Sequence, residues 1–275
     1  MTLTGRDDSL ESAGEADDPQ LRGVRLQTDY LETELRLRAA GVQQTIVVFG
    51  GTRIIEESAA RQLVEKRRLA CGKKPDDVRR KEQLAIAESL LAKSHFYTIA
   101  REFGAIVGKA GGGPADCSLT LVTGGGPGIM EAASRGSCEV GAKNIGLNIT
   151  LPNEQHPNRY LTRELSFTLR YFAIRKLHFL LRARALVVFP GGYGTLDELF
   201  ETLNLVATGT IDALPIVLVG ESYWRRLVDL DLLVLEGVIE PSHRELCCFA
   251  ESAQQTWQII KDWHERAGIA LHCPV

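Results

Sequence analysis

The sequence lacks any uninterrupted apolar run long enough to cross a bilayer, because charged residues interrupt every candidate. The N-terminus is acidic and has no apolar core of the kind found in secretory signals, so we expect none. The 6 cysteines include no C-x-x-C pair, and the scattered histidines and cysteines have no zinc-ligand spacing. We therefore expect reduced thiols in a cytoplasmic protein that does not associate with a membrane.

The sequence also lacks a strong excess of one charge. Its 32 Lys and Arg against 35 Asp and Glu give a net charge of −3, which offers no general attraction to nucleic acid. No G-K-[ST] follows a glycine run, which excludes a P-loop. The run Gly124 to Gly128 fits the dinucleotide fingerprint poorly, because Ile129 occupies the last glycine position. This mismatch argues against an NAD-dependent dehydrogenase.

Apolar segments rich in β-branched residues alternate with amphipathic segments along the chain. We predict strands over 45–49, 119–122, 144–149, 165–169, 185–189, 215–219 and 246–249. We predict helices over 21–40, 83–110, 171–184, 195–207, 223–235 and 253–266, with a further helix from Ile129 and a helical excursion over 56–80. Continuous apolar strands that alternate with helices indicate an α/β fold: a doubly wound, Rossmann-like, mostly parallel sheet with helices on both faces.

This pattern also suggests how the chain divides. Residues 1–20 are polar, acidic and poor in aromatics, so we expect a disordered tail. We expect an N-terminal helical extension over 21–44, a single Rossmann-like domain over 45–268, and a short tail over 269–275.

Three glycine-rich loops follow predicted strands: Gly50-Gly51, Gly124 to Gly128, and Gly191 to Gly194. Ligands of doubly wound sheets bind at this carboxyl end of the strands. The third loop leads directly into a helix, whose free N–H groups and positive dipole end favour a phosphate. Gly124 to Gly128 could form a second wall for a nucleotide, or could simply be a tight turn before a helix.

Several charged residues could act beside this phosphate site. Glu198 lies one turn into the helix, but acidic residues in first turns are common, so Asp197, Glu198 and Glu201 are equivalent on sequence grounds. Thr195 could cap the helix or contact the phosphate. One helix and one strand fit between Arg175-Lys176 and Glu198, so the basic pair could reach the same cleft, or it could belong to a solvated helix face.

The segment Pro190 to Glu198, PGGYGTLDE, matches the signature P-G-G-x-G-T-x-x-E of the Lonely Guy (LOG) family. Arg175-Lys176 and the loop Gly124 to Met130 also resemble that family, and the resemblance covers roughly residues 45–266. LOG proteins are phosphoribohydrolases, which cleave the N-glycosidic bond of nucleoside 5′-monophosphates to a free base and ribose 5-phosphate. The family has also carried the label "lysine decarboxylase", but the sequence has no motif for a lysine-linked pyridoxal phosphate.

The resemblance implies roles for individual residues. Glu198 would stabilise positive charge at C1′ and orient or deprotonate the attacking water, and Arg175 would hold the nucleotide. The other implied substrate- and phosphate-binding residues are Gly191, Gly192, Gly194, Thr195, Gly125, Gly126, Gly128, Met130, Gly51, Thr52 and Lys176. The resemblance implies no metal or organic cofactor, and it implies a homodimer or larger homo-oligomer with sites near the subunit interface.

The stretch Gly146 to Asn158 is similar to a longer bacterial branch of the family. AMP-type purine monophosphates are therefore expected as substrates at least as much as cytokinin ribotides. The alternative is a non-catalytic nucleotide or molybdenum-cofactor carrier on the same scaffold. The presence of both Arg175 and Glu198 favours an enzyme.

Overall fold

The computed structural model of the chain describes residues 18–111, 118–150 and 156–271. The tails expected over 1–20 and 269–275 therefore lie mostly outside the described residues, since 1–17 and 272–275 are not described. None of the helices within the described ranges has the length and apolar content needed to cross a membrane.

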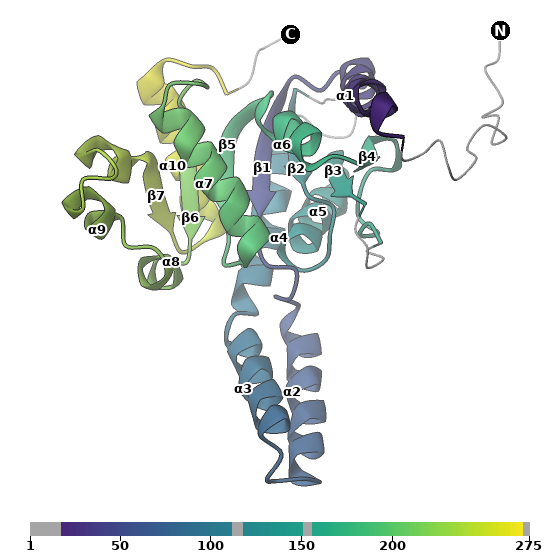
Figure 1. Cartoon of the computed structure of the whole chain (residues 1–275), viewed down its shortest axis with the longest axis vertical. Helices are drawn as coiled ribbons and strands as arrows, with labels where there is room; N and C mark the ends of the chain where they lie inside the picture. The colour runs from purple at the N-terminus through teal and green to yellow at the C-terminus, as the bar shows by residue number, and fades with distance from the viewer. Residues whose placement is uncertain (1–17, 112–117, 151–155, 272–275) are drawn as a thin grey trace, which may run out of the picture.

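Seven parallel strands form one sheet (Figure 1). They are β1 (Gln44–Phe49), β2 (Leu119–Thr123), β3 (Asn144–Ile149), β4 (Ser166–Leu169), β5 (Ala183–Val188), β6 (Ile216–Val219) and β7 (Cys247–Ala250). Their order across the sheet is β4-β3-β2-β1-β5-β6-β7, and every neighbouring pair is parallel. The predicted doubly wound α/β fold is confirmed, and each predicted strand is present to within two residues at either end.

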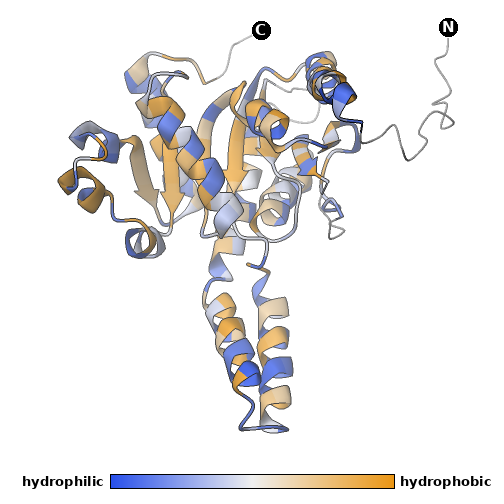
Figure 2. Ribbon diagram, in the orientation of Figure 1, coloured by the Kyte–Doolittle hydropathy of each residue, from blue (hydrophilic) through white to orange (hydrophobic). Residues whose placement is uncertain are grey.

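Helices cover both faces of the sheet (Figures 1 and 2). Helices α4 (His95–Ala110), α5 (Ile129–Glu139) and α10 (Ala253–Ala267) pack on one face. Helices α1 (Arg22–Ala39), α6 (Phe172–Leu180), α7 (Tyr193–Ala207) and α8 (Glu221–Leu227) pack on the other. The remaining short elements are α9 (Leu230–Leu235) and the 3-10 turns η1 (Pro19–Leu21), η2 (Arg163–Leu165) and η3 (Pro241–Leu246).

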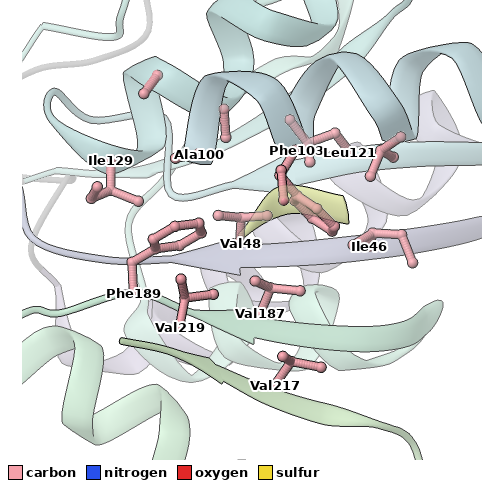
Figure 3. Close-up of a cluster of buried hydrophobic side chains, with 14 of the residues drawn as sticks. Ile46, Val48, Ala100, Phe103, Leu121, Ile129, Val187, Phe189, Val217 and Val219 are labelled. Atoms are coloured by element: carbon pink, nitrogen blue, oxygen red, sulfur yellow. The ribbon is translucent and has the colours of Figure 1, made fainter. Parts of the chain in front are cut away.

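The central strands are apolar along their whole length because both of their faces are buried. In β1, Ile46 and Val48 enter the core beneath α4 and α5, whereas Val47 and Phe49 enter the core beneath α6 and α7. Figure 3 shows the first core, where Phe103 and Ile129 lie over the strand side chains. A strand with one face exposed to solvent would alternate between apolar and polar residues. The central strands do not show this alternation.

The strand order reverses between β1 and β5, which are neighbours in the sheet although far apart in sequence. At such a switch point the loops leaving the two strands diverge and leave a crevice. The loop after β1 begins at Gly50, and the loop after β5 contains Gly191 and Gly192. Two of the three glycine-rich loops therefore lie at the topological switch point, and the third follows the adjacent β2.

Three predicted helices differ in extent from the observed ones. The single helix predicted over 83–110 is wrong: α3 (Val78–Ala92) pairs with α2 (Glu57–Gly72) in a hairpin that projects from the sheet, and α4 starts afresh (Figure 1). Between α3 and α4, the Ser94 hydroxyl donates to the carbonyl of Leu91 at 2.8 Å, a local bond that competes with helix continuation.

The helix predicted over 223–235 is likewise divided, into α8 and α9. Asp229 lies between them and accepts from the N–H of Leu232 at 2.9 Å, so it starts a new helix as an N-cap. The helix predicted over 171–184 already ends at Leu180, and β5 begins at Ala183.

Helix α1 is attached to the sheet layer by a buried ion pair. Both carboxylate oxygens of Glu34 accept from Arg182, at 2.9 and 2.8 Å, and Glu34 also accepts from Arg38 at 2.6 Å. The Arg182 hydrogen bond outweighs the cost of burial and lowers the pKa of Glu34 from 4.5 to about 2. Because the folded-state pKa is depressed, this contribution to stability is present above pH 4.5 and is lost as the pH falls towards 2.

We expect Glu34→Gln to lower the free energy of unfolding at pH 7 by ~3 kcal/mol, because it breaks the paired contact with Arg182. Urea unfolding at pH 7, 4 and 3 measures the effect, and the difference from wild type should shrink as the pH falls. Glu32→Gln is the matched control, because Glu32 is exposed and pairs only within α1, with Arg36. A pH-independent difference would contradict this account of Glu34.

Candidate functional site

A cavity of about 350 Å³ opens at the carboxyl end of the strands beside the switch point. It is lined by residues from all three glycine-rich loops and from helices α6 and α7. The lining residues are Phe49, Gly50, Gly51, Thr52, Gly124, Met130, Asn148, Ile149, Phe172, Arg175, Gly192, Tyr193, Gly194, Thr195 and Glu198. Eight of the thirteen residues expected from the sequence therefore meet in one place.

The loop after β5 brings the N-terminus of α7 to this cavity. The N-cap residue is Gly192, which has no side chain to satisfy the first N–H groups of the helix. Neither Gly192 nor Gly194 has a heavy atom within 4 Å of the place where a Cβ would stand, so backbone faces open space there. A helix N-terminus with free donors and an unobstructed approach is suited to bind a phosphate.

Gly191 has a different function in the same loop. A Cβ at this position would lie 2.1 Å from the hydroxyl oxygen of Thr195, so only glycine lets the loop close over Thr195. The carbonyl of Gly191 accepts from the hydroxyl of Tyr223 at 2.6 Å. Gly191 thus shapes the phosphate loop from behind and does not itself line the cavity.

The loop after β2 forms the opposite wall, but most of its glycines are buried behind the surface. Gly125 and Gly128 have positive φ angles of 72° and 73°. A Cβ on Gly128 would lie 2.4 Å from the carbonyl oxygen of Gly51, and the buried Asn158 amide donates to the carbonyls of Gly125 and Gly126. The structure therefore does not bring Gly125, Gly126 or Gly128 to the cavity lining, because Gly128 packs on the loop after β1 and the other two are held by Asn158.

Glu198 reaches the cavity from the first turns of α7. It is only 4% exposed, and its Oε1 lies 3.2 Å from Nη2 of Arg175. Burial raises the pKa of Glu198 to about 7, although the positive charges of Arg175 and Lys176 lower it. A carboxyl group that titrates near neutral pH can exchange a proton with a substrate or a water molecule.

Arg175 is held between aromatic rings on α6. Its guanidinium carbon lies 5.3 Å from the ring centre of Phe172 and 5.4 Å from that of Phe179. These contacts place the cation on aromatic faces and direct it toward Glu198. Its buried Nε atom has no hydrogen-bond partner among the described residues, so a donor is left over beside the cavity.

The ambiguity among the three acidic residues of α7 is resolved by their faces on the helix. Asp197 and Glu201 are four residues apart on one face, and both pair with Lys176, at 2.8 and 3.3 Å. Glu198 lies on the adjoining inward face. The expectation that Lys176 binds substrate is therefore not met: it does not line the cavity, because Asp197 and Glu201 hold it away from there.

Sequence reasoning missed some cavity residues. Asn148 was not identified, although a buried amide near the end of an apolar strand is unusual enough to be noticed. Its Nδ2 donates to the carbonyl of Phe167 at 3.0 Å, which leaves its oxygen beside the Gly125 loop. Nothing in the sequence marks Phe172 and Tyr193 as cavity residues, since aromatic residues occur at many positions outside binding sites.

The buried carboxyl group gives a prediction about stability. Because the folded-state pKa of Glu198 is raised, ionisation costs stability as the pH rises from 4.5 through 7. We expect Glu198→Gln to unfold like the wild type at pH 4.5 and to be more stable at pH 8, by at most ~3 kcal/mol. Thermal and urea unfolding at both pH values measure this difference.

Glu201→Gln serves as the matched control, because Glu201 is on the same helix but pairs with Lys176 near the surface. Its effect should stay within ~1 kcal/mol at either pH. Equal stability of Glu198→Gln and wild type at pH 8 would be inconsistent with a carboxylate that is costly to bury.

Comparison with known proteins finds one family model and several relatives. The family model described as "Possible lysine decarboxylase" matches residues 130–260. The cytokinin riboside 5′-monophosphate phosphoribohydrolase LOG3 of Arabidopsis thaliana is 32% identical over 162 residues, which are 56% of this chain and 74% of that protein. The Arabidopsis phosphoribohydrolase LOG1 is 31% identical over 159 residues, covering 55% of this chain and 73% of the relative.

Solved structures with similar folds include a Moco carrier protein from Chlamydomonas reinhardtii. It is 17% identical, with a TM-score of 0.46, and the match covers 82% of this chain and 99% of the carrier. The molybdenum cofactor binding protein of Rippkaea orientalis is 20% identical, with a TM-score of 0.42, over 61% of this chain and 87% of that chain. The identity to the Arabidopsis proteins, over nearly three quarters of their length, is the finding that decides the family. The chain belongs to the LOG family.

Proposed function

We propose that the protein is a nucleoside 5′-monophosphate phosphoribohydrolase. It cleaves the N-glycosidic bond of purine monophosphates of the AMP type, or of cytokinin ribotides, to a free base and ribose 5-phosphate. The observation that carries the proposal is the buried Glu198–Arg175 pair in the same cavity as the uncapped N-terminus of α7. The names of the Arabidopsis relatives support the same reaction class.

In this mechanism the two ends of the cavity have separate tasks. The N–H groups at the start of α7, with Gly192, Gly194 and Thr195, bind the 5′-phosphate. Glu198, as a carboxylate, stabilises the positive charge that develops at C1′ when the bond to the base breaks. The bonding electron pair leaves with the base nitrogen. Water adds to C1′, and its proton passes to Glu198 and then to the departing base.

Arg175 keeps Glu198 in place and brings its positive charge to the cavity that the nucleotide enters. Binding energy from the phosphate, remote from C1′, is used to reach the transition state. A monophosphate should therefore react where the corresponding nucleoside does not.

The test is base release, followed by chromatography, from AMP, GMP, CMP, isopentenyladenosine monophosphate and adenosine. We expect release from the purine monophosphates and none from adenosine. Glu198→Gln should bind nucleotide but lose turnover by ~10²-fold or more, whereas Glu201→Gln should retain it. For the wild type, kcat/KM should rise as the pH increases through about 7, where Glu198 loses its proton.

Nucleotide binding without base release from any of these compounds would refute the hydrolase and favour a carrier of nucleotide or molybdenum cofactor. Turnover by Glu198→Gln at the wild-type rate would remove Glu198 from the mechanism. The relative rates with AMP and isopentenyladenosine monophosphate separate the two substrate preferences.

The proposal includes a homodimer or larger homo-oligomer. It is supported by exposed apolar side chains at the cavity, Phe172 and Tyr193, and by others farther along α6 and α7 or just after α6: Leu177, Leu181 and Phe200. We expect light scattering to give at least twice the mass of one chain, and Leu181→Asp to reduce it. A monomeric wild type at micromolar concentration would contradict this part of the proposal.

We also place the protein in the cytoplasm, which suits the free cysteines of the described residues, Cys71, Cys138, Cys247 and Cys248.

A further inference from the structure

Helix α6, which carries Arg175, begins without a cap of its own. Its N-cap residue, Tyr171, makes no side-chain capping bond. The carboxylate of Asp29 on α1 instead holds the two residues that lead into α6, because its Oδ2 accepts from the N–H groups of Arg170 at 2.7 Å and Tyr171 at 3.1 Å. Arg25, one turn earlier on α1, donates to the hydroxyl of Tyr171 at 3.1 Å. A helix remote in sequence therefore fixes the start of α6.

Helix α1 also holds the last turn of α6 and the segment that follows it. The rings of Tyr30 and His178 stack at 5.1 Å between centres, with an angle of 17° between their planes. Just after α6, Arg182 makes its paired contact with Glu34 and donates to the carbonyl of Val42 at 3.3 Å. Helix α1 thus contacts the residues that lead into α6, the last turn of α6 and the segment just after it.

These contacts matter because α6 is short. It has 9 residues, of which only His178 and Phe179 are fully buried. Helices of this length are marginal without external support. Arg175 lies one turn after the Asp29 contact and one turn before His178, and its Nη2 is 3.2 Å from Glu198. A shift of α6 by one ångström would change that distance directly.

We propose that α1 positions Arg175 against Glu198, with Asp29 as the principal positioning residue. Asp29 touches neither the cavity nor Glu198 and acts through the backbone at the start of α6. The expectation that loss of Asp29 slows turnover rests on the proposed function. The expectation that it disturbs the Arg175–Glu198 contact does not. The N-terminal extension is thus a part of the site's framework.

The ionisation of Glu198 reports this contact without any need for activity. The charged groups around Glu198 are Arg175 and Lys176 from α6 and Asp197 and Glu201 from α7. Asp197 and Glu201 both pair with Lys176, whereas Arg175 pairs with Glu198 itself, so withdrawal of Arg175 removes the nearest cation. The midpoint of Glu198 titration should then move to higher pH.

The experiment is carbon-13 NMR of the full chain with labelled glutamate carboxyl groups, in which the Glu198 signal is assigned by its loss in Glu198→Gln. We expect Asp29→Ala to raise the Glu198 midpoint by about 1 pH unit. Asp29→Asn retains an oxygen acceptor and should fall between Asp29→Ala and wild type. If base release is measurable, its acidic limb should shift in the same direction, and kcat should fall on the order of 10-fold or more.

Two controls separate positioning from loss of stability. Glu32→Ala removes an exposed α1 side chain that pairs only with Arg36. Ile260→Val loosens the core beneath α10, on the opposite face of the sheet. Neither should move the Glu198 midpoint. If Asp29→Ala gives no folded protein, Arg25→Met removes the neighbouring contact to Tyr171 and should raise the midpoint by a smaller amount.

An unchanged Glu198 midpoint in Asp29→Ala would overturn the proposal, as would an equal shift in Ile260→Val. A wild type that releases no base but shows the expected Glu198 shift in Asp29→Ala would refute the proposed function and leave the positioning role intact. Base release by the wild type with no Glu198 shift in Asp29→Ala would support the proposed function and refute the positioning role of Asp29.

Discussion

The ion pair between Glu198 and Arg175 is the contact on which the rest of the site depends. A carboxyl group that is 4% exposed would be neutral at physiological pH without a nearby cation, and an unpaired arginine in the same place would be costly. Burial and the guanidinium oppose each other, and the balance leaves the pKa of Glu198 at about 7. The two residues come from α6 and α7, so this balance exists only while both helices are held against the sheet.

The sheet provides that support through close backbone contacts at its switch point. The loops after β1, β2 and β5 approach one another too tightly for side chains, as the contacts of Gly128 with Gly51 and of Gly51 with the carbonyl of Pro190 illustrate. Glycine at these positions therefore has two distinct functions. Some glycines, such as Gly192 and Gly194, leave the approach to the helix N-terminus open, and others let the walls meet behind it.

Much of the fold and part of the site could be predicted from the sequence. Continuous apolar strands indicated a parallel sheet covered on both faces, and the loop from Pro190 to Thr195 indicated a helix N-terminus suited to phosphate. The helix breaks at Ser94 and Asp229 were missed, because polar residues inside an amphipathic pattern are compatible with one long helix until the tertiary contacts are known. Asn148 was missed although it lies in the stretch Gly146 to Asn158, because its position beside the Gly125 loop is set by the tertiary structure.

The sequence by itself determined the alternation of strands and helices and the position of the glycine-rich loops, since both follow from local spacing and backbone freedom. The family signature points to Glu198, but only the tertiary structure shows why it faces the cavity, because Asp197, Glu198 and Glu201 are alike in local spacing and differ in which neighbours surround them. It also decided that Lys176 is occupied by Asp197 and Glu201. Finally, the contact of Asp29 with the start of α6 joins segments more than a hundred residues apart, and no local pattern records such a contact.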